Sequence, residues 1–435
     1  MGLTREEMNN YTAILKEELI PAMGCTEPIA VAYAAAKAGQ VLAEKPVHLN
    51  VRCSGNIIKN VKGVTVPNSG NQKGIEVAAT LGITGGNADK ELEVIASVTD
   101  DDRKEAGRLV SEGFCEVELE EGVPNLWIRA TAKGENGHTA IVLIEDTHTN
   151  ITYIEKDGEV VFKKGETAED DGAVHGDRTK MTLKGLLEYA DTVDLEDIRE
   201  TLDMQIKCNT AISDEGLKND WGASVGKTLL ENWGTSDVKI RACARAAAGS
   251  DARMSGCPLP VVINSGSGNQ GITVTMPVLT FAEEWNVPED KMYRALLVSN
   301  LISVYIKHYI GALSAFCGAV SAGCAAGAAV AYMDGADYDL IGQTIVNSLG
   351  NVGGIICDGA KSSCGAKIAS SVNAALRAYY MAKSNRGFRP GEGFVEDTYE
   401  KTIKNMGYIG KVGMANTDIE VLNVMIGKVD TDTVM

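Results

Sequence analysis

The spacing of apolar residues changes character twice along the chain. Residues 4–20 have apolar positions at helical spacing and begin with TREE, the pattern of a capping box. Residues 26–42 predict a second helix, with Thr26 or Glu27 as its cap. We therefore expect the chain to open with two helices.

Short runs of β type replace this spacing between residues 46 and 164. The runs VHLNVRC, CEVELE, NLWIRATA, HTAIVLIE and NITYIEK predict strands, and helical stretches near residues 72–82 and 101–112 interrupt them. After Met181 the spacing is helical almost to the end, and the helices are rich in Ala and Gly. We predict an α+β fold, in which a mixed β-rich α+β domain precedes a large Ala/Gly-rich all-helical domain.

These changes divide the chain into three parts. Residues 1–44 are expected to form helices that pack on the helical domain, residues 45–178 the α+β domain, and residues 179–435 the helical domain. The polar, acidic segment 163–177 is the expected linker.

One stretch of the helical part, residues 309–333, has no charged residue and is long enough to span a bilayer. Most of its residues are Ala, Gly, Ser and Cys, which give little hydrophobic drive but let helix backbones approach closely. We therefore expect a helix or helix pair at the centre of a soluble bundle and no membrane partner.

The charge of the chain changes the range of partners to consider. With 41 basic and 59 acidic residues, the net charge of −18 opposes binding to nucleic acid or anionic lipid. We expect a small-molecule substrate, with a homodimer as an option. The acidic, amphipathic N-terminus lacks the layout of a secretory signal, which predicts a cytoplasmic location.

The chain has ten cysteines, and disulfides are not expected in a reducing compartment. Five sit in ordinary apolar or amphipathic surroundings and are expected to be small buried hydrophobic residues: Cys53, Cys115, Cys208, Cys243 and Cys257. Five others are embedded in Gly-rich or turn-like sequence, where packing explains a thiol less well: Cys25, Cys317, Cys324, Cys357 and Cys364.

Cys25 directly precedes the second predicted helix, in the segment GCTEP. The positive end of a helix dipole lowers the pKa of a thiol, which would favour a reactive thiolate there. A structural thiol at a helix cap is the alternative. Glu27 is either a catalytic acid or a helix-capping acid.

Two segments resemble one another, VPNSGNQKGI at residues 66–75 and VINSGSGNQGI at residues 262–272. Each presents backbone N–H groups and amide side chains at the start of a predicted helix, a good place for a carboxylate. Ordinary glycine turns that cap helices are the alternative. The candidate substrate-binding residues are Asn68, Ser69, Asn71, Gln72, Asn264, Ser265, Ser267, Asn269 and Gln270.

Other motifs carry less weight. GSGNQG fits the dinucleotide pattern G-x-G-x-x-G, but no β-α-β unit surrounds it and Pro277 is expected to interrupt the next helix early. GASVGKT has one residue too few for a phosphate-binding loop. The histidines show no paired spacing for zinc and are expected at the surface or in local bonds: His48, His138, His148, His175 and His308.

The segment NVGGIICDGAKSSCGAK places Cys357 and Cys364 seven positions apart, with little around them that could build a core. Iron–sulfur clusters need thiolates on flexible backbone, because several sulfurs must converge on one inorganic core. Cys317 or Cys324 could supply a third ligand, and three ligands would leave one iron open as a Lewis acid. Zinc or a redox cluster is the alternative.

The cysteines stand in a pattern that resembles the archaeal and bacterial L-cysteine desulfidases, in GCTEP, AFCGAVSAGC and GIICDGAKSSC. The resemblance runs over essentially the whole chain. It implies that Cys317, Cys357 and Cys364 ligate a 4Fe-4S cluster and that Cys25 is a proton acceptor, which leaves Cys324 for packing. The NSGSGNQGI loop and the helical half are also similar, more remotely, to the alpha part of iron–sulfur L-serine dehydratases.

This resemblance implies a carbon–sulfur lyase that works without pyridoxal phosphate and converts L-cysteine to sulfide, ammonia and pyruvate by α,β-elimination. The leaving group would bind the open iron, and Cys25 would remove the Cα proton. Elimination from L-serine or another β-substituted amino acid is one alternative. A non-catalytic metal or redox sensor is the other.

Overall fold

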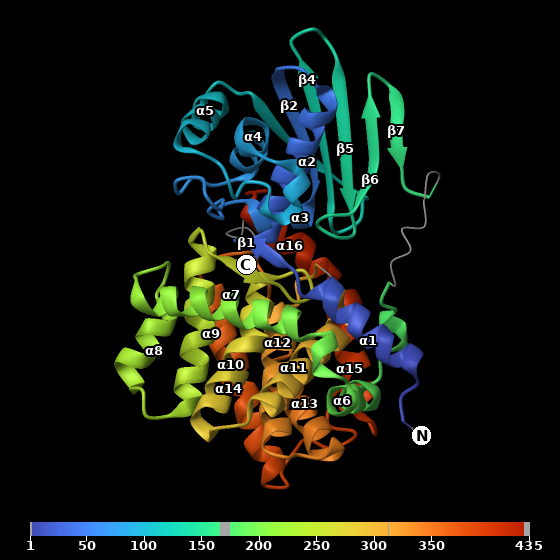
Figure 1. Cartoon of the computed structure of the whole chain (residues 1–435), viewed down its shortest axis with the longest axis vertical. Coiled ribbons are helices and arrows are strands. Elements are labelled where there is room, and N and C mark those ends of the chain that lie inside the picture. The colour runs from blue at the N-terminus through green and yellow to red at the C-terminus, as the bar shows by residue number, and fades with distance from the viewer. Residues whose placement is uncertain (1, 166–174, 312, 430–435) are drawn as a thin grey trace.

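A computed structural model describes residues 2–165, 175–311 and 313–429, and it shows two halves stacked along the long axis of the molecule (Figure 1). One half contains a six-stranded sheet with helices packed against it, and the other is built mainly from helices. The predicted α+β fold class is therefore confirmed. Most of the predicted linker 163–177 lies outside the described residues.

The sheet has the strand order β3-β2-β4-β5-β6-β7. Only β2 and β3 are parallel neighbours among these strands. A parallel pair requires a crossover connection, which α3, α4, η1 and α5 provide between β2 and β3. The elements of this half are β2 (Pro46–Ser54), α3 (Gly55–Val61), α4 (Ile75–Gly85), η1 (Ala88–Glu93), α5 (Asp100–Ser111), β3 (Cys115–Glu120), β4 (Trp127–Gly134), β5 (Thr139–Glu145), β6 (Ile151–Lys156) and β7 (Glu159–Lys163).

The two N-terminal helices pack on different halves. In α1 (Arg5–Glu18) the predicted capping box is present, and the helix contacts α6 (Leu183–Thr192) and α11 (Glu289–Ile310) of the helical half. By contrast, α2 (Thr26–Leu42) packs on β4, β5 and α4. Residues 1–44 thus do not form one layer on the helical domain as expected, because the small apolar residues of α2 are buried between the sheet and α4.

The helical half surrounds α12, which packs against α10, α11, α13 and α14. Its remaining elements are η2 (Arg178–Lys180), η3 (Leu195–Asp197), α7 (Arg199–Lys218), α8 (Val225–Trp233), α9 (Val238–Met254), β8 (Pro260–Val262), α10 (Gly268–Trp285), α12 (Gly318–Met333), α13 (Tyr338–Val352), α14 (Cys364–Lys383), α15 (Tyr399–Tyr408), η4 (Ile409–Gly413) and α16 (Ala415–Met425). The uncharged stretch 309–333 therefore holds the end of α11 and all of α12.

Small residues allow α12 to approach its neighbours closely. A Cβ atom at Gly327 would lie 2.7 Å from the Cβ of Ala375 in α14, a distance too short for two carbon atoms. Nearly every residue of α12 is buried. Within the part of the chain that the structure describes, no helix is long and apolar enough to cross a membrane.

Pro277 does not end α10, contrary to the expectation from the sequence. The helix runs from Gly268 to Trp285 with Pro277 inside it. The proline removes one backbone donor, and the Ser299 hydroxyl of α11 donates to the carbonyl oxygen of Val274 at 2.7 Å in the turn before the proline. Burial against α9, α11 and α12 holds the rest of the helix in place.

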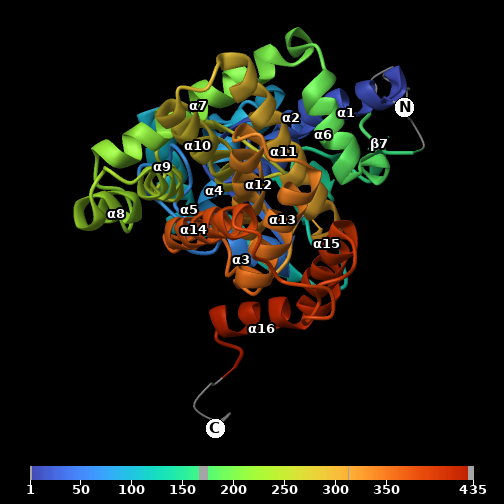
Figure 2. The same ribbon diagram turned by 90° about the horizontal axis from the view of Figure 1, so that it is seen from below.

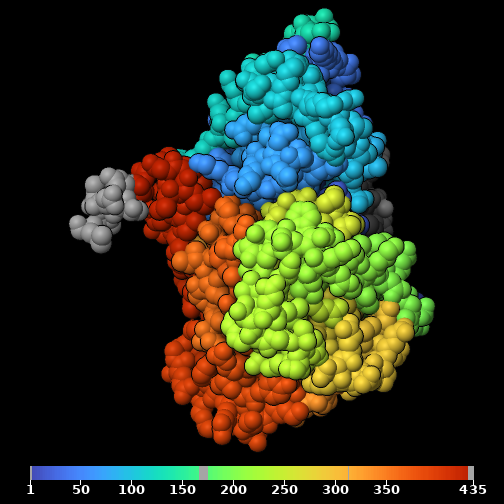
Figure 3. Space-filling view, turned by 90° about the vertical axis from the view of Figure 1, so that its left-hand side faces the viewer, coloured from blue at the N-terminus to red at the C-terminus, as the bar shows by residue number. Residues whose placement is uncertain are grey.

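Two contacts between secondary-structure elements connect the two halves beside the cavity described below. β1 (Pro21–Met23) pairs antiparallel with β8, so the turn before α2 lies beside the loop before α10. At the C-terminus, α16 packs on α3 of the sheet half. Figure 2 shows α16 beside α3, and Figure 3 shows it at the edge of the molecule where the two halves meet.

Candidate active site

A cavity of about 100 Å³ lies at the junction of the two halves. It gathers Cys25 and the three candidate cluster ligands, although long stretches of sequence separate them. Its polar and thiol-bearing wall residues are Cys25, Glu27, Lys59, Asn60, Arg253, Ser267, Asn269, Gln270, Lys307, Ser314, Cys317, Cys357 and Cys364.

A short antiparallel bridge places Cys317 beside Cys357. The N–H of Cys317 donates to the carbonyl of Ile355 at 3.0 Å, and the N–H of Cys357 donates to the carbonyl of Ala315 at 2.7 Å. The neighbouring Cys317 thiol and the charge of Lys59 lower the pKa of Cys357, against the effect of burial. The neighbouring Cys357 and burial raise the pKa of Cys317.

Cys364 reaches the cavity as the first residue of α14. The loop before it packs tightly on α3, since a Cβ atom at Gly359 would lie 2.5 Å from the carbonyl oxygen of Lys59. Gly359 also has a φ of +89°, which side chains disfavour. Burial raises the pKa of Cys364, and the backbone N–H of Lys361 opposes that effect.

Backbone N–H groups stabilise the thiolate form of all three candidate ligands. The N–H of Lys361 donates to Cys364 Sγ at 3.4 Å, and the N–H groups of Ala319 and Gly359 act to lower the pKa of Cys317 and of Cys357. Such bonds stabilise thiolates and are typical of iron–sulfur ligation. The donor set of soft sulfurs suits a cluster, whose ligands bind different iron atoms. No group of three or more His, Cys, Asp or Glu residues in the described ranges is placed to hold a single metal ion.

Four helices begin at the cavity. The N-caps of α2, α10 and α12 are Cys25, Ser267 and Cys317, and Cys364 is the first residue of α14. None of the four helices has a side-chain hydrogen bond at its N-cap. Unsatisfied N–H groups and positive dipole ends are thus concentrated at one place, which favours thiolates and a bound carboxylate.

Cationic side chains add to this positive potential. Lys59 is buried, donates to the carbonyl of Cys357 at 3.4 Å and forms an ion pair with Asp418 of α16. Burial lowers the pKa of Lys307, although the nearby Cys357 and Cys317 thiols oppose that shift. The Nε of Arg253 donates to the carbonyl of Gly24 at 2.7 Å and so holds the turn before Cys25.

Cys25 and Glu27 form a hydrogen-bonded pair in the cavity wall. The Cys25 Sγ donates to Glu27 Oε2 at 3.0 Å, and Asn60 Nδ2 donates to Glu27 Oε1 at 3.0 Å. Burial and the Glu27 charge raise the pKa of Cys25 well above its ordinary value. The expected lowering by the helix end is therefore overcome, and the resting group is a thiol.

Glu27 itself is ionised. Burial alone would raise its pKa, but His148, the Cys25 hydrogen bond and Arg253 together lower it. His148 is a buried residue from the segment between β5 and β6, with Nε2 lacking a hydrogen-bond partner. It was not expected near the site. Three other histidines form local pairs at the surface: His48 with Glu116, His138 with Asp157, and His175 with Glu17.

The second glycine-rich loop reaches the cavity. Ser267, Asn269 and Gln270 line it, and the side-chain oxygens Asn269 Oδ1 and Gln270 Oε1 are buried without a hydrogen-bond partner. Buried polar atoms are nearly always paired, so these two oxygens suit contact with a ligand. Asn264 and Ser265 shape the loop instead: Asn264 Nδ2 donates to the carbonyl oxygen of Asn300 at 3.2 Å, and Ser265 Oγ to Asn264 Oδ1 at 3.0 Å.

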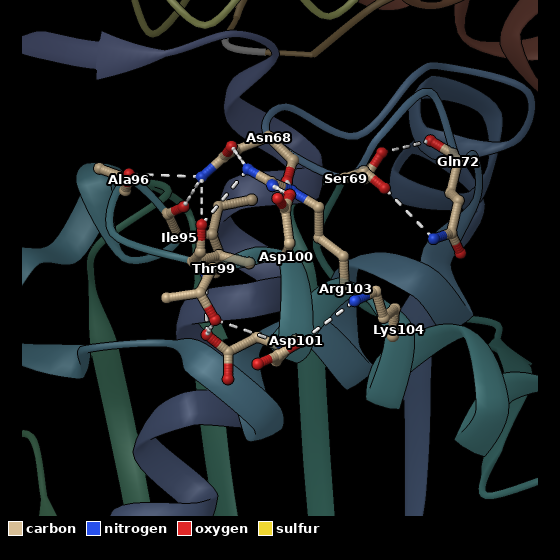
Figure 4. A network of polar contacts seen from close by, with 12 residues as sticks. Asn68, Ser69, Gln72, Ile95, Ala96, Thr99, Asp100, Asp101, Arg103 and Lys104 are labelled. Carbon is tan, nitrogen blue, oxygen red and sulfur yellow. Dashed lines mark hydrogen bonds and ion pairs between the residues drawn. The ribbon is translucent and has the colours of Figure 1, made fainter.

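The first glycine-rich loop lies beside the turn before Cys25, but Asn68, Ser69, Asn71 and Gln72 are not in the cavity wall. Figure 4 shows the contacts that hold this loop together. Asn68 Nδ2 donates to the carbonyl of Ile95 at 2.9 Å, and Ser69 and Gln72 bond to each other's carbonyls at 3.0 and 3.2 Å. Arg103 of α5 donates to the carbonyl of Asn68 at 2.7 Å. Asn71 is exposed.

A second chamber of about 710 Å³ adjoins the cavity and shares Leu313 and Ser314 with it. α16 contributes Asp418, Ile419 and Leu422 to its wall.

The sequence analysis did not predict several residues that line the cavity or contact its wall. Lys59, Arg253 and Lys307 stand in apolar or small-residue surroundings, and that contrast is a signal of a buried, paired charge. Lys307 is the clearest case, because it interrupts the apolar run LISVYI. Asn60 and His148 had no such signal, since only the fold brings them to Glu27.

This fold and site define a protein of the serine dehydratase alpha-chain type. The family model described as serine dehydratase alpha chain matches residues 89–423, so the chain belongs to that family. The resemblance to this wider group is confirmed, and membership indicates an enzyme of lyase type.

Similar proteins match nearly the whole chain. A UPF0597 protein of Finegoldia magna is 49% identical over 97% of this chain and 100% of its own length. Another from Lachnoclostridium phytofermentans is 50% identical over 95% of this chain and 98% of its own. A third, from Treponema denticola, is 44% identical over 98% and 100%. The chain is therefore also a member of the UPF0597 family.

Proposed function

We propose that the protein is an iron–sulfur-dependent L-cysteine desulfidase that converts L-cysteine to sulfide, ammonia and pyruvate without pyridoxal phosphate. One observation carries most of the weight. Three cysteine thiols from two separate parts of the chain and the Cys25–Glu27 pair face the same cavity, at the start of four helices.

In this proposal Cys317, Cys357 and Cys364 hold a 4Fe-4S cluster. Its fourth iron, free of protein thiolate, would supply Lewis-acid chemistry at the leaving group of the substrate. The residues prepare the site by charge: Lys59 and Lys307 lie near the thiols and offset the negative charge of the thiolates. The backbone N–H groups around each sulfur act in the same direction.

The amino-acid substrate is held by the start of α10. Its carboxylate is placed at the unsatisfied N–H groups after Ser267, where the helix dipole favours an anion. Its ammonium group donates to the unpaired oxygens of Asn269 and Gln270. Asn264, Ser265 and the residues 68–72 act by holding the shapes of the two loops.

Cys25 removes the Cα proton. Its thiol lies at the start of α2 in the same wall as the ligand cysteines, so a substrate bound at α10 can present Cα to it. The electron pair of the C–H bond forms the Cα–Cβ double bond as the bond from Cβ to the leaving group breaks. The aminoacrylate that results hydrolyses to pyruvate and ammonia.

The test is anaerobic purification with iron and sulfide analysis, followed by assays of sulfide and pyruvate release from L-cysteine and, in parallel, from L-serine. We expect bound iron and inorganic sulfide, and equal amounts of sulfide and pyruvate from L-cysteine. Iron-loaded protein that releases no product from any amino acid would contradict the proposal and leave a metal or redox sensor.

L-serine dehydratase activity is the second candidate, because the matching family model is that of the serine dehydratase alpha chain. In this reaction Cys25 would again remove the Cα proton, and hydroxide would be the leaving group. Pyruvate from L-serine together with none from L-cysteine would decide for this candidate.

We also propose that the protein forms homodimers and is located in the cytoplasm. The net charge of −18 opposes nucleic acid as a partner.

A further inference from the structure

Glu27 occupies a position that helix capping does not explain. Its two carboxylate oxygens accept from Cys25 Sγ and from Asn60 Nδ2, both at 3.0 Å. The N-cap of α2 is Cys25, and no side chain caps this helix. The carboxylate is therefore aimed at the thiol and fixed there by α3.

Cys25 is a buried thiol that can act as a base only after it has lost its proton. In the described parts of the chain, Glu27 is the one side chain that accepts a hydrogen bond from Cys25 Sγ. Asn60 holds the far oxygen of the carboxylate, so Oε2 stays directed at the sulfur. The geometry supplies one acceptor, already in contact.

We propose that Glu27 takes the proton of Cys25 and is thereby a catalytic residue of the cavity. This inference rests on the proposed elimination. The proton moves from Sγ to Oε2, which leaves a thiolate beside a neutral carboxylic acid. The thiolate then takes the Cα proton of the substrate while the C–H electron pair forms the double bond. The leaving hydrosulfide departs with the electron pair of the Cβ–S bond, and the acid returns its proton to it.

Titratable and charged groups from several elements face this pair, and burial lowers the pKa of one of them, His148. Arg253 of α9 and His148 act on Glu27, and Glu27 also acts on Lys307 of α11. Lys361, from the loop before α14, interacts with Cys25. Moving a proton from the thiol to the carboxylate leaves the net charge of the site unchanged, because the thiolate gains the negative charge that the carboxylate loses.

A structural acid in the first turn of α2 is the competing explanation, because acids there interact favourably with the helix dipole. Glu76 gives a matched control. It stands in the first turn of the neighbouring α4, is exposed and does not line the cavity. Glu76→Gln removes the same charge from an equivalent helical position.

The test compares the cluster-loaded parent protein with Glu27→Gln, Glu27→Asp and Glu76→Gln. We expect Glu27→Gln to lower kcat by about 100-fold or more, as removal of an acid–base group does. KM and iron content should stay near the parent values. Glu27→Asp should recover part of the loss, and Glu76→Gln should have the parent kcat. A Glu27→Gln variant with kcat within about threefold of the parent overturns the proposal.

A second measurement does not depend on turnover. The alkylation rate of Cys25 by iodoacetamide is followed by mass spectrometry of the peptide that contains it. In the parent the rate should be nearly flat between about pH 6 and 8, because the proton is passed to Glu27 inside the protein. In Glu27→Gln it should rise about tenfold per pH unit, as for a thiol that loses its proton to solvent.

These outcomes separate the two proposals. A parent protein that releases no product but shows the flat alkylation profile contradicts the elimination and keeps the role of Glu27 as proton acceptor. A parent profile that rises about tenfold per pH unit overturns that role. Complete resistance of Cys25 to alkylation also counts against it, because the pair then never presents a thiolate.

Discussion

Two backbone hydrogen bonds decide which groups surround the thiol of Cys357. The bridge between residues 315–317 and 355–357 places this side chain next to Cys317 and near Lys59. Cys324, only seven positions after Cys317, is instead buried inside α12 with its Sγ 3.8 Å from the carbonyl of Ile345. The two thiols are a matched pair for experiment.

We predict that Cys357→Ser loses most of its bound iron and that sulfide release from L-cysteine falls by about 100-fold or more, since loss of a ligand costs at least as much as loss of a supporting residue. Iron analysis after anaerobic purification measures the loss of bound iron, and a sulfide assay measures the fall in activity. Cys324→Ser should keep its iron. Equal iron contents in the two variants would contradict the ligand assignment.

Asp251 gives a prediction on pH and stability. It is buried in α9, accepts from the N–H of Gly226 at 3.0 Å, and burial raises its pKa to about 6. An acid with a raised folded-state pKa contributes stability that is complete below its unfolded pKa and is lost as the pH rises through about 6.

Asp251→Asn should therefore raise the free energy of unfolding by about 1–3 kcal/mol at pH 8, where it replaces a buried charge, and change it little at pH 4. Urea unfolding of parent and variant at both pH values measures the difference. A stability change that is the same at the two pH values would show that ionisation of Asp251 is not its cause.

Among the elements, α12 depends on small residues for its position at the centre of the helical half. Gly327 faces Ala375 of α14 at a distance that leaves no room for a methyl group. Since α12 and α14 both begin at the cavity, their separation also sets the positions of Cys317 and Cys364.

We predict that Gly327→Ala destabilises the protein. Alanine improves helix propensity by about 1 kcal/mol, but overpacking costs typically 1–3 kcal/mol and should outweigh it. Gly413→Ala is the control, because a Cβ there would meet its nearest atom at 3.8 Å. Denaturant midpoints of the two variants test this. A Gly327→Ala variant as stable as the parent would mean that the helices separate at no cost.

For the whole molecule, the contact between the C-terminal helix α16 and α3 holds the halves together beside the cavity. Lys59 of α3 is almost completely buried, with 1% of its side chain exposed, and its ion pair with Asp418 crosses between the halves. Lys428 and Glu121 make a second cross-contact at 3.8 Å, with both side chains largely exposed.

Removal of one partner from a buried pair leaves an uncompensated charge. We expect Asp418→Asn to lower the free energy of unfolding by about 3–5 kcal/mol, whereas Glu121→Gln at the exposed pair should change it by less than about 1 kcal/mol. Urea unfolding followed by circular dichroism compares them. Similar changes in the free energy of unfolding for both variants would mean that the ammonium group of Lys59 becomes hydrated once Asp418 is replaced.

The sequence by itself determined the class of fold and most of its elements. Period-two runs became β2 to β6, and the capping box TREE started α1, because these signals act between residues close in the chain. At Pro277 burial against neighbouring elements outweighed a local rule, so the proline stands inside α10. The helix α2 was predicted with the correct bounds, but its packing against the sheet and α4 was not predicted, because packing partners are set by contacts far apart in the chain.

Only the tertiary structure decided which residues share the cavity. It brought one of the two similar loops into the wall and left the other outside, and it added Lys59, Asn60, Arg253 and Lys307. It also reversed the expected pKa of Cys25, because burial and the neighbouring Glu27 outweigh the helix dipole. Distances between residues far apart in the chain set these effects, and local sequence patterns do not contain them.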